Sequence, residues 1–227
     1  AYYRWTDTRT YEKEPDEFFP FDIRVRLGLV GARVIFDRYD DLFNPSRGFG
    51  LTSDVGVSSE TWGSDFAYST WLTTFGFAIP FADQGTWLQT ARVGVAEPLE
   101  GDDLIREAKF FAGGQGSVRG FDRNTVGPVT FGFDGSLVPA GGGALFILNE
   151  ELRFSIWRSI RAAVFADIGQ VWERWGETDE ELSVGAGLGL RWTTPIGLLW
   201  ADVAWPVHNP GISSETAKFY IGIGRPF

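Results

Sequence analysis

Residues 182–192 alternate strictly between apolar side chains and small or polar ones, and this pattern restricts the fold more than any other feature of the chain. One row of alternate positions consists of Leu182, Val184, Ala186, Leu188, Leu190 and Trp192, and the other of Ser183, Gly185, Gly187, Gly189 and Arg191. Successive side chains of a β-strand point to opposite faces of the sheet, so a period of two predicts a strand with one apolar face. The pattern recurs along the chain and predicts nine strands, with a tenth within Ala1–Tyr11 that we expect to be frayed.

The composition agrees with an all-β protein of either of two kinds. Aromatic residues make up 16% of the chain, it contains 29 glycines, and it has no apolar run long enough for a membrane-spanning helix. This combination is typical of barrels that cross a membrane with strands, whose outer face meets lipid and whose inner face lines a lumen. It also fits a tryptophan-rich soluble sandwich, in which two apolar sheet faces pack together.

The lengths of the predicted connections favour the barrel. Short connections are predicted near 82–85, 157–159 and 194–197, and long ones near 59–65, 97–143, 173–181 and 206–217. Short and long connections alternate along the chain, as they do in membrane barrels with short periplasmic turns and long extracellular loops. We therefore predict an all-β, transmembrane antiparallel β-barrel with its C-terminus on the periplasmic side.

Charge and residue types exclude several functions. The 20 basic and 30 acidic residues give a net charge of -10, which argues against nucleic-acid binding. The chain has no cysteine and a single histidine, His208, so it offers no thiolate metal site and no zinc site. It also lacks the G-x-S-x-G nucleophile elbow of serine hydrolases that use a Ser/His/Asp triad. We expect no enzymatic activity, no metal and no cofactor.

The longest connection contains the segment Gly113–Phe121, which reads GGQGSVRGF. Taken alone, such a segment is a flexible glycine-rich loop, and it lacks the Lys-Ser/Thr pair of a phosphate-binding loop. Two further motifs accompany it in the chain. Residues 165–169 read FADIG, and the stretch from Asp37 to Gly48 ends in NPSRG.

This ordered set of motifs resembles the superfamily of outer-membrane protein assembly and secretion barrels that includes BamA, TamA and FhaC, also called the bacterial surface antigen family. The resemblance covers roughly residues 22–227, although Tyr39 and Ser46 depart from the usual turn motif. It implies a sixteen-stranded barrel, usually preceded by periplasmic POTRA domains. The chain has neither that length nor a POTRA-like pattern, so we expect it to hold the C-terminal nine or ten strands. A small self-contained relative is the alternative.

The resemblance also implies a division of the chain and a site. Residues 1–21 are expected to form a frayed strand or extracellular loop, and residues 22–227 the barrel strands, with an inward-folding loop at 97–143. In this family the VRGF/Y signature lies in the sixth extracellular loop, which folds back into the lumen, and the F-x-D-x-G strand motif receives its arginine. The residues of this loop–lumen clamp are Val118, Arg119, Gly120, Phe121, Glu151, Phe165, Asp167 and Gly169.

Elementary electrostatics supports a pair between Arg119 and Asp167 independently. Asp167 shares the inner row of its strand with Gly169, and a carboxylate in a narrow lumen needs a partner or a raised pKa. A guanidinium can pair with both carboxylate oxygens, and Glu151 of the preceding strand is placed to share it. The alternative is that Arg119 is a solvated loop residue and Asp167 one of many lumen charges.

The last predicted strand supplies a second candidate site, at the barrel seam. One interpretation is that Gly222 and Gly224 weaken the edge of this strand, and the alternative is that they suit a tight lumen face. The residues of this seam and terminal signal are Phe219, Ile221, Gly222, Ile223, Gly224 and Phe227.

The resemblance implies a barrel that inserts or exports other outer-membrane or surface proteins. The alternatives are a two-partner-secretion pore for one dedicated substrate, a passive channel or structural barrel, and the membrane anchor of a fused enzyme. The expected partners are outer-membrane lipids and lipopolysaccharide, unfolded or nascent outer-membrane or secreted proteins, and periplasmic accessory proteins.

Overall fold

The chain is built almost entirely from β-strands in the computed structural model, which describes residues 1–11, 22–81, 85–101, 103–132, 134–177, 179–195 and 197–224. The strands are β1 (Tyr2–Tyr11), β2 (Asp22–Asp37), β3 (Gly48–Ser58), β4 (Tyr68–Phe81), β5 (Gly85–Pro98), β6 (Val129–Phe131), β7 (Leu137–Pro139), β8 (Ala144–Trp157), β9 (Ile160–Trp172), β10 (Ser183–Thr194), β11 (Gly197–His208) and β12 (Lys218–Ile223). Two single turns of 3-10 helix, η1 (Glu60–Trp62) and η2 (Arg106–Ala108), lie in loops. Among the described residues, no helix has the length and apolar character needed to cross a membrane.

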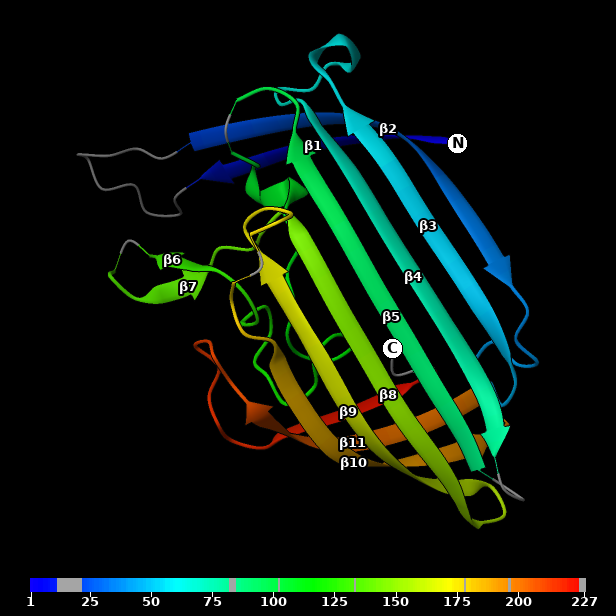
Figure 1. Ribbon diagram of the computed structural model, residues 1–227. Helices are drawn as coiled ribbons and strands as arrows, with labels where there is room; N and C mark the ends of the chain where they lie inside the picture. The colour runs from blue at the N-terminus through cyan, green and yellow to red at the C-terminus, as the bar shows by residue number, and fades with distance from the viewer. Residues whose placement is uncertain are drawn as a thin grey trace.

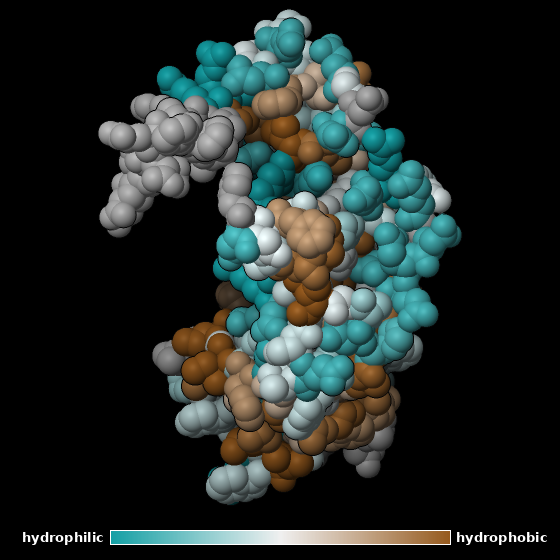
Figure 2. Space-filling model, turned by 90° about the vertical axis from the view of Figure 1, so that its left-hand side faces the viewer, coloured by the Kyte–Doolittle hydropathy of each residue, from teal (hydrophilic) through white to brown (hydrophobic). Residues whose placement is uncertain are grey.

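Ten of the strands form one antiparallel sheet in the order β1-β2-β3-β4-β5-β8-β9-β10-β11-β12. Each strand of this sheet pairs with the next one along the chain, and the β6–β7 hairpin lies in the insertion between β5 and β8. The sheet curls into an arc with β1 and β12 at its two edges (Figure 1). Seen from the side of the long loops, the molecule has a curved outline that is hollow on one side (Figure 2). The predicted all-β antiparallel fold is confirmed.

The alternation of side chains separates an inner and an outer face of the arc. In β10, Ser183 and Arg191 are buried on the inner face, whereas Leu188 on the outer face is 55% exposed. Other large apolar side chains on the outer face are also exposed, among them Val55, Trp71, Phe75, Ile79, Val164, Leu190, Trp192, Phe219 and Ile221. The outer face is therefore an apolar surface, and the inner face carries the polar and small residues.

The two ends of the strands differ in their connections, as predicted. Residues 82–84, 158–159 and 195–196 connect strands at one end, and residues 59–67, 99–143, 173–182 and 209–217 at the other. One connection breaks this regularity. The β2–β3 turn, residues 38–47, is much longer than its neighbours at the short-turn end.

Three details differ from the sequence-based expectation or add to it. β11 continues to His208, so the loop expected to begin at Pro206 begins later. Pro206 has no N–H to donate, and the strand tolerates it because the register with β10 shifts beside its partner Gly185. The β6–β7 hairpin in the long loop has strands too short to show an alternation. The segment Tyr2–Tyr11, where a frayed strand was expected, pairs along its length with β2. Phe227 of the predicted terminal signal lies outside the described residues.

A lysine on the outer face tests whether this face meets lipid. Leu188 lies midway along β10, and Leu188→Lys should destabilise the folded barrel by about 2–4 kcal/mol, the typical effect of a cation at the bilayer midplane. Val207→Lys, also on the outer face but near the end of β11, should have an effect of about 0–1 kcal/mol. Urea titration of refolding into lipid vesicles measures both. Equal effects at the two positions would contradict a lipid-facing surface.

Candidate functional site

The long loop between β5 and β8 returns to the inner face of the sheet and packs closely on it. A Cβ atom built on Gly185 of β10 would lie 1.9 Å from the carbonyl oxygen of Arg119, and one on Gly169 of β9 would lie 2.8 Å from a methyl of Val118. Gly120 has a φ of 96°, and a Cβ there would lie 2.6 Å from the backbone of Trp205. Side chains at these positions would push the loop off the wall.

An apolar cluster holds the loop on either side of this contact. Val118 and Phe121 are buried, with 0% and 1% of their surface exposed, and they pack with residues of β8 and β9. The full set of buried residues in this cluster is Ala112, Val118, Phe121, Val126, Leu145, Ile147 and Val171. The predicted clamp residues Val118 and Phe121 therefore anchor the loop through apolar contacts.

Arg119 lies between these two anchors and reaches Asp167 of β9. Its Nε lies 2.7 Å from Oδ2 of Asp167 and its Nη2 lies 2.9 Å from Oδ1, and its backbone N–H also donates to Oδ2 at 2.9 Å. The guanidinium stacks on the ring of Phe165, 3.5 Å from the ring centroid. Arg119 is 1% exposed and Asp167 is 0% exposed. The structure thus places the arginine of the loop and the aspartate of the FADIG segment in one bidentate, fully buried pair.

The pair belongs to a larger cluster of charges on the inner wall. Nη1 of Arg119 lies 3.1 Å from Glu151 of β8 and 2.9 Å from Asp202 of β11. Arg191 of β10 bonds to the same two carboxylates, and Arg153 of β8 bonds to Glu151 at 2.7 Å. The three arginines and three carboxylates are all nearly inaccessible to solvent, and their formal charges cancel. The members are Arg119, Glu151, Arg153, Asp167, Arg191 and Asp202.

Sequence reasoning brought only half of this cluster together. It paired Arg119 with Asp167 and gave Glu151 a share of the arginine, but it assigned no role to Arg153, Arg191 or Asp202. The inner rows of β8 and β10 already contained Arg153 and Arg191, so their direction was available from the alternation. Which charges meet inside the arc depends on the curvature of the sheet, which the alternation does not specify.

The loop is also tied to the last strand. The N–H of Gly120 donates to the hydroxyl of Tyr220 at 3.1 Å, and that hydroxyl donates to the carbonyl of Phe121 at 3.3 Å. The carboxylate of Asp122 accepts from the ammonium of Lys218 at 2.5 Å and from the N–H of Ser214 at 2.9 Å. The hydrogen bond from Lys218 is the main reason why the pKa of Asp122 falls to about 2.

Four of the predicted seam residues lie in β12, on both of its faces. Phe219, Ile221 and Ile223 point outward, and each has at least 67% of its surface exposed. Gly222 lies on the inner face, where a Cβ atom would come within 2.5 Å of the indole ring of Trp200. Gly224 has a φ of 93°, and its N–H donates to the carbonyl of Leu198. The close packing at Gly222 corresponds to the tight-lumen interpretation of this glycine.

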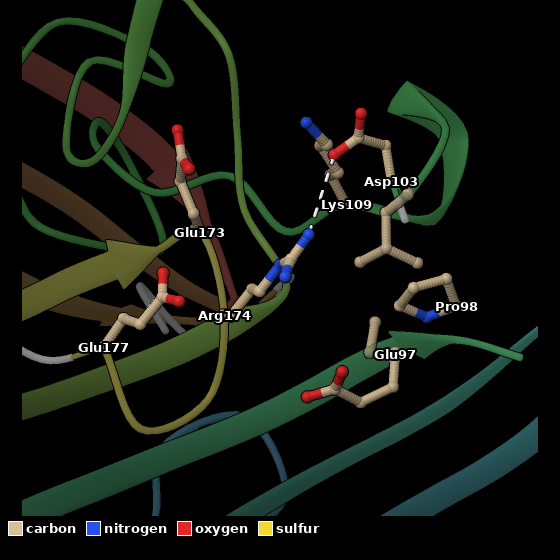
Figure 3. A pocket seen from close by; sticks show the side chains of 9 residues that line it. Glu97, Pro98, Asp103, Lys109, Glu173, Arg174 and Glu177 are labelled. Carbon is tan, nitrogen blue, oxygen red and sulfur yellow. Dashed lines mark ion pairs between the residues drawn. The ribbon is translucent and has the colours of Figure 1, made fainter. Parts of the chain in front are cut away.

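A separate cavity of about 240 Å³ lies among the long loops, away from the clamp. It brings together acidic side chains of β5 and of the connections 99–143 and 173–182 with the basic side chains of Lys109 and Arg174, and Arg174 lies 3.9 Å from Asp103 (Figure 3). Its charged lining residues are Glu97, Asp103, Lys109, Glu173, Arg174 and Glu177. Within the described ranges, no three His, Cys, Asp or Glu side chains are grouped so as to hold a metal ion. The buried charge cluster is the better defined site.

Comparison with known proteins relates the chain to one family. A family model described as the Omp85 superfamily domain matches residues 24–227. The chain is 24% identical over 229 residues to the outer membrane protein assembly factor BamA of Neisseria meningitidis serogroup B, and 27% identical over 217 residues to that of Neorickettsia risticii. These alignments cover 84% and 88% of this chain but only 28% and 27% of the relatives, so the chain spans less than a third of their length.

A solved structure shows the same fold. The crystal structure of BamA from Haemophilus ducreyi lacking POTRA domains 1–3 superposes with a TM-score of 0.72 at 19% sequence identity. The superposition covers 92% of this chain and 46% of that chain. The curved antiparallel sheet is therefore a barrel-type sheet, as the alternation and the connection lengths predicted.

Removal of the loop arginine tests the clamp. Arg119→Ala leaves the carboxylates of Asp167, Glu151 and Asp202 short of a cation, and loss of one partner of a buried pair typically costs about 3–5 kcal/mol. We expect protease cleavage within residues 99–143 to rise at least about tenfold while the barrel stays folded by heat modifiability. Arg119→Lys should not restore protection, because an ammonium cannot make the bidentate pair. Arg123→Ala, in the same loop, is the control, and equal cleavage of both variants would contradict the clamp.

Acid should release the loop from the last strand. The pKa of Asp122 is lowered in the folded protein, so its contribution is complete above its ordinary pKa of 3.8 and is lost as the pH falls toward about 2. Because the Asp122 side chain is 43% exposed, the effect on stability should stay below about 1 kcal/mol. Hydrogen exchange of the Ser214 amide, corrected for its intrinsic pH dependence, should lose protection in this window. Asp122→Asn should remove the pH dependence, and its persistence in that variant would assign it to another group.

Proposed function

Because the chain belongs to the Omp85 superfamily, we propose that it forms the membrane-embedded part of a barrel that assembles other proteins into the bacterial outer membrane. The curated relatives of known function that match it are outer-membrane protein assembly factors, which supports assembly ahead of secretion through a dedicated pore. The barrel itself acts by binding and release of strands and is not an enzyme.

The main observation in support of this proposal is that residues 118–121 of the long loop bind to the inner wall. Arg119 is held by three carboxylates from three strands, and the residues on both sides of it are buried in apolar contacts. A passive channel needs an open, hydrated lumen, whereas this loop occupies the space in front of β8 to β11. Such specific binding is expected in a barrel that works only while the loop keeps one fixed position against the inner wall.

Each clamp residue has a physical role in this proposal. Arg119 ties the loop to Asp167 and shares Glu151, while Phe165 provides the surface on which its guanidinium stacks. Val118 and Phe121 anchor the loop in the apolar cluster. The remaining clamp residues, Gly120 and Gly169, provide the room for close approach.

The clamp also reaches the strand at which we place the seam. Gly120, Phe121 and Asp122 bond to Tyr220 and Lys218, so the position of the loop sets the position of β12. A strand edge with unpaired N–H and C=O groups templates an incoming strand. We propose that substrate strands enter beside β12, whose residues Phe219, Ile221 and Ile223 face outward. Gly222 places no side chain on the inner face of β12 and Gly224 follows directly after the strand, and we propose that Phe227 contributes to a terminal signal.

The orientation follows from the connections. We propose an outer-membrane location with the long loops outside and the C-terminus in the periplasm, because β12 runs from a long loop toward the short-turn end. The apolar outer face then contacts outer-membrane lipids and lipopolysaccharide. Unfolded outer-membrane proteins are the substrates, delivered with periplasmic accessory proteins, and the net charge of -10 disfavours any nucleic acid.

Reconstitution of the full-length protein that contains this chain tests the function. A urea-unfolded outer-membrane protein added to proteoliposomes should become heat-modifiable and membrane-inserted at least about tenfold faster than with empty liposomes. Arg119→Ala should lose most of this acceleration, and Arg123→Ala should keep it. Transfer of the added protein into the vesicle interior would instead show a secretion pore. Ion flux without any effect on insertion would show a channel.

A further inference from the structure

The β2–β3 turn, residues 38–47, reaches into the arc instead of continuing the rim of short turns. Leu42 and Phe43 in its middle are 58% and 63% exposed, whereas Pro45, which follows them, is buried. The second half of the turn therefore packs against the rest of the molecule, and its contacts show where.

The start of the turn lies in a slot of two glycines on the inner face. Cβ atoms built on Gly50 of β3 and Gly76 of β4 would each lie 2.7 Å from the side chain of Tyr39. The ring of Tyr39 therefore covers both glycines. Asp40 shapes the rest of the turn, because its carboxylate accepts hydrogen bonds from the N–H groups of Ser46 and Arg47 at 2.9 and 3.0 Å.

The second half of the turn bonds to strands that are distant in the sheet. The side-chain amide of Asn44 donates to the hydroxyl of Thr193 in β10 at 3.2 Å. Its carbonyl accepts from Nη1 of Arg153 in β8 at 3.1 Å. Since β3 neighbours only β2 and β4 in the sheet, these contacts cross the inside of the arc.

Arg153 is the point at which this turn meets the buried charge cluster. Its guanidinium donates to Glu151 through Nε at 2.7 Å and to Asn44 through Nη1, and it is 1% exposed. Glu151 in turn accepts from Arg119 of the long loop. One continuous path of hydrogen bonds thus runs from Asn44 through Arg153 and Glu151 to the loop.

We propose that the β2–β3 turn is an internal brace, which crosses the short-turn mouth of the barrel and positions Arg153, so that the turn and the long loop stabilise one charge cluster from opposite ends. Asn44 is the positioning residue, and Tyr39 seats the base of the brace. The importance of the brace for assembly rests on the proposed function. Its existence and its coupling to the loop are measured on the folded barrel without substrate, so either proposal can fail alone.

Cross-linking tests whether the turn lies inside. The chain has no cysteine, so a pair introduced as Asn44→Cys and Thr193→Cys in the full-length protein, with any other cysteines removed, can be joined by a short reagent with two thiol-reactive groups, such as a bis-methanethiosulfonate. We expect efficient cross-linking in native outer membranes, visible as faster migration of the denatured chain. Asn44→Cys with Trp192→Cys is the matched control, because Trp192 adjoins Thr193 but faces outward. Absent or equal cross-linking of the two pairs overturns the brace.

Limited proteolysis tests the coupling. A hydrogen bond to a charged group corresponds to about tenfold in an equilibrium constant, so Asn44→Ala should raise cleavage within residues 99–143 several-fold, up to about tenfold. Asn44→Asp keeps an acceptor for Arg153 and should keep the loop protected. Leu42→Ala, at an exposed position of the same turn, should change nothing. Wild-type cleavage of a heat-modifiable Asn44→Ala barrel would show that Asn44 positions nothing and would overturn the proposal. If Asn44→Ala does not fold, cross-linking decides.

Discussion

Six ionisable side chains packed together out of water are the constraint on which the inner architecture depends. Desolvation penalises each buried ion by several kcal/mol, and only good geometry with every partner offsets it. Arg119, Glu151 and Asp167 meet this condition together with charges from β10 and β11, because each guanidinium is shared between acceptors. Such a cluster adds little net stability compared with apolar packing, but the loss of one member leaves the others unpaired. Its main effect is to hold the loop and four neighbouring strands in one mutual arrangement.

The close approach that this cluster needs comes from small residues on the inner face. Gly169 and Gly185 leave the space that Val118 and the backbone of Arg119 occupy, while the outer rows of the same strands carry large apolar side chains. One alternation therefore serves two purposes. It presents an apolar surface outward and leaves a shallow, polar wall inside, against which a loop can lie.

Much of this was predictable from the sequence, and the limits have physical causes. The period of two indicated most strands and their inner and outer rows, and the motif order indicated that Arg119 meets Asp167. Asp202 was missed as a partner because strand alternation gives the direction of a side chain but not the curvature that brings β8 close to β11. Arg153 lies two residues after Glu151 on the same inner row of β8, so the alternation already held that contact. The end of β11 was placed too early because Pro206 usually ends a strand, whereas here a shift in register accommodates it. The inward fold of the β2–β3 turn depends on contacts of Asn44 with strands more than one hundred residues away, which local patterns do not contain.

The two interpretations of Gly222 are compatible once its surroundings are considered. The indole of Trp200 occupies the place of a side chain at Gly222, so the glycine is needed for close packing of β11 on β12. Because of this glycine, β12 has no inner side chain at that position. The strand is therefore held in part by its pairing with β11 and by the hydrogen bonds of the loop to Tyr220 and Lys218. A strand held in this way responds to the position of the loop. The buried arginine cluster and the edge of the sheet are thus parts of one mechanical unit, in which a change at Arg119 is transmitted to β12 through the residues that follow it in the chain.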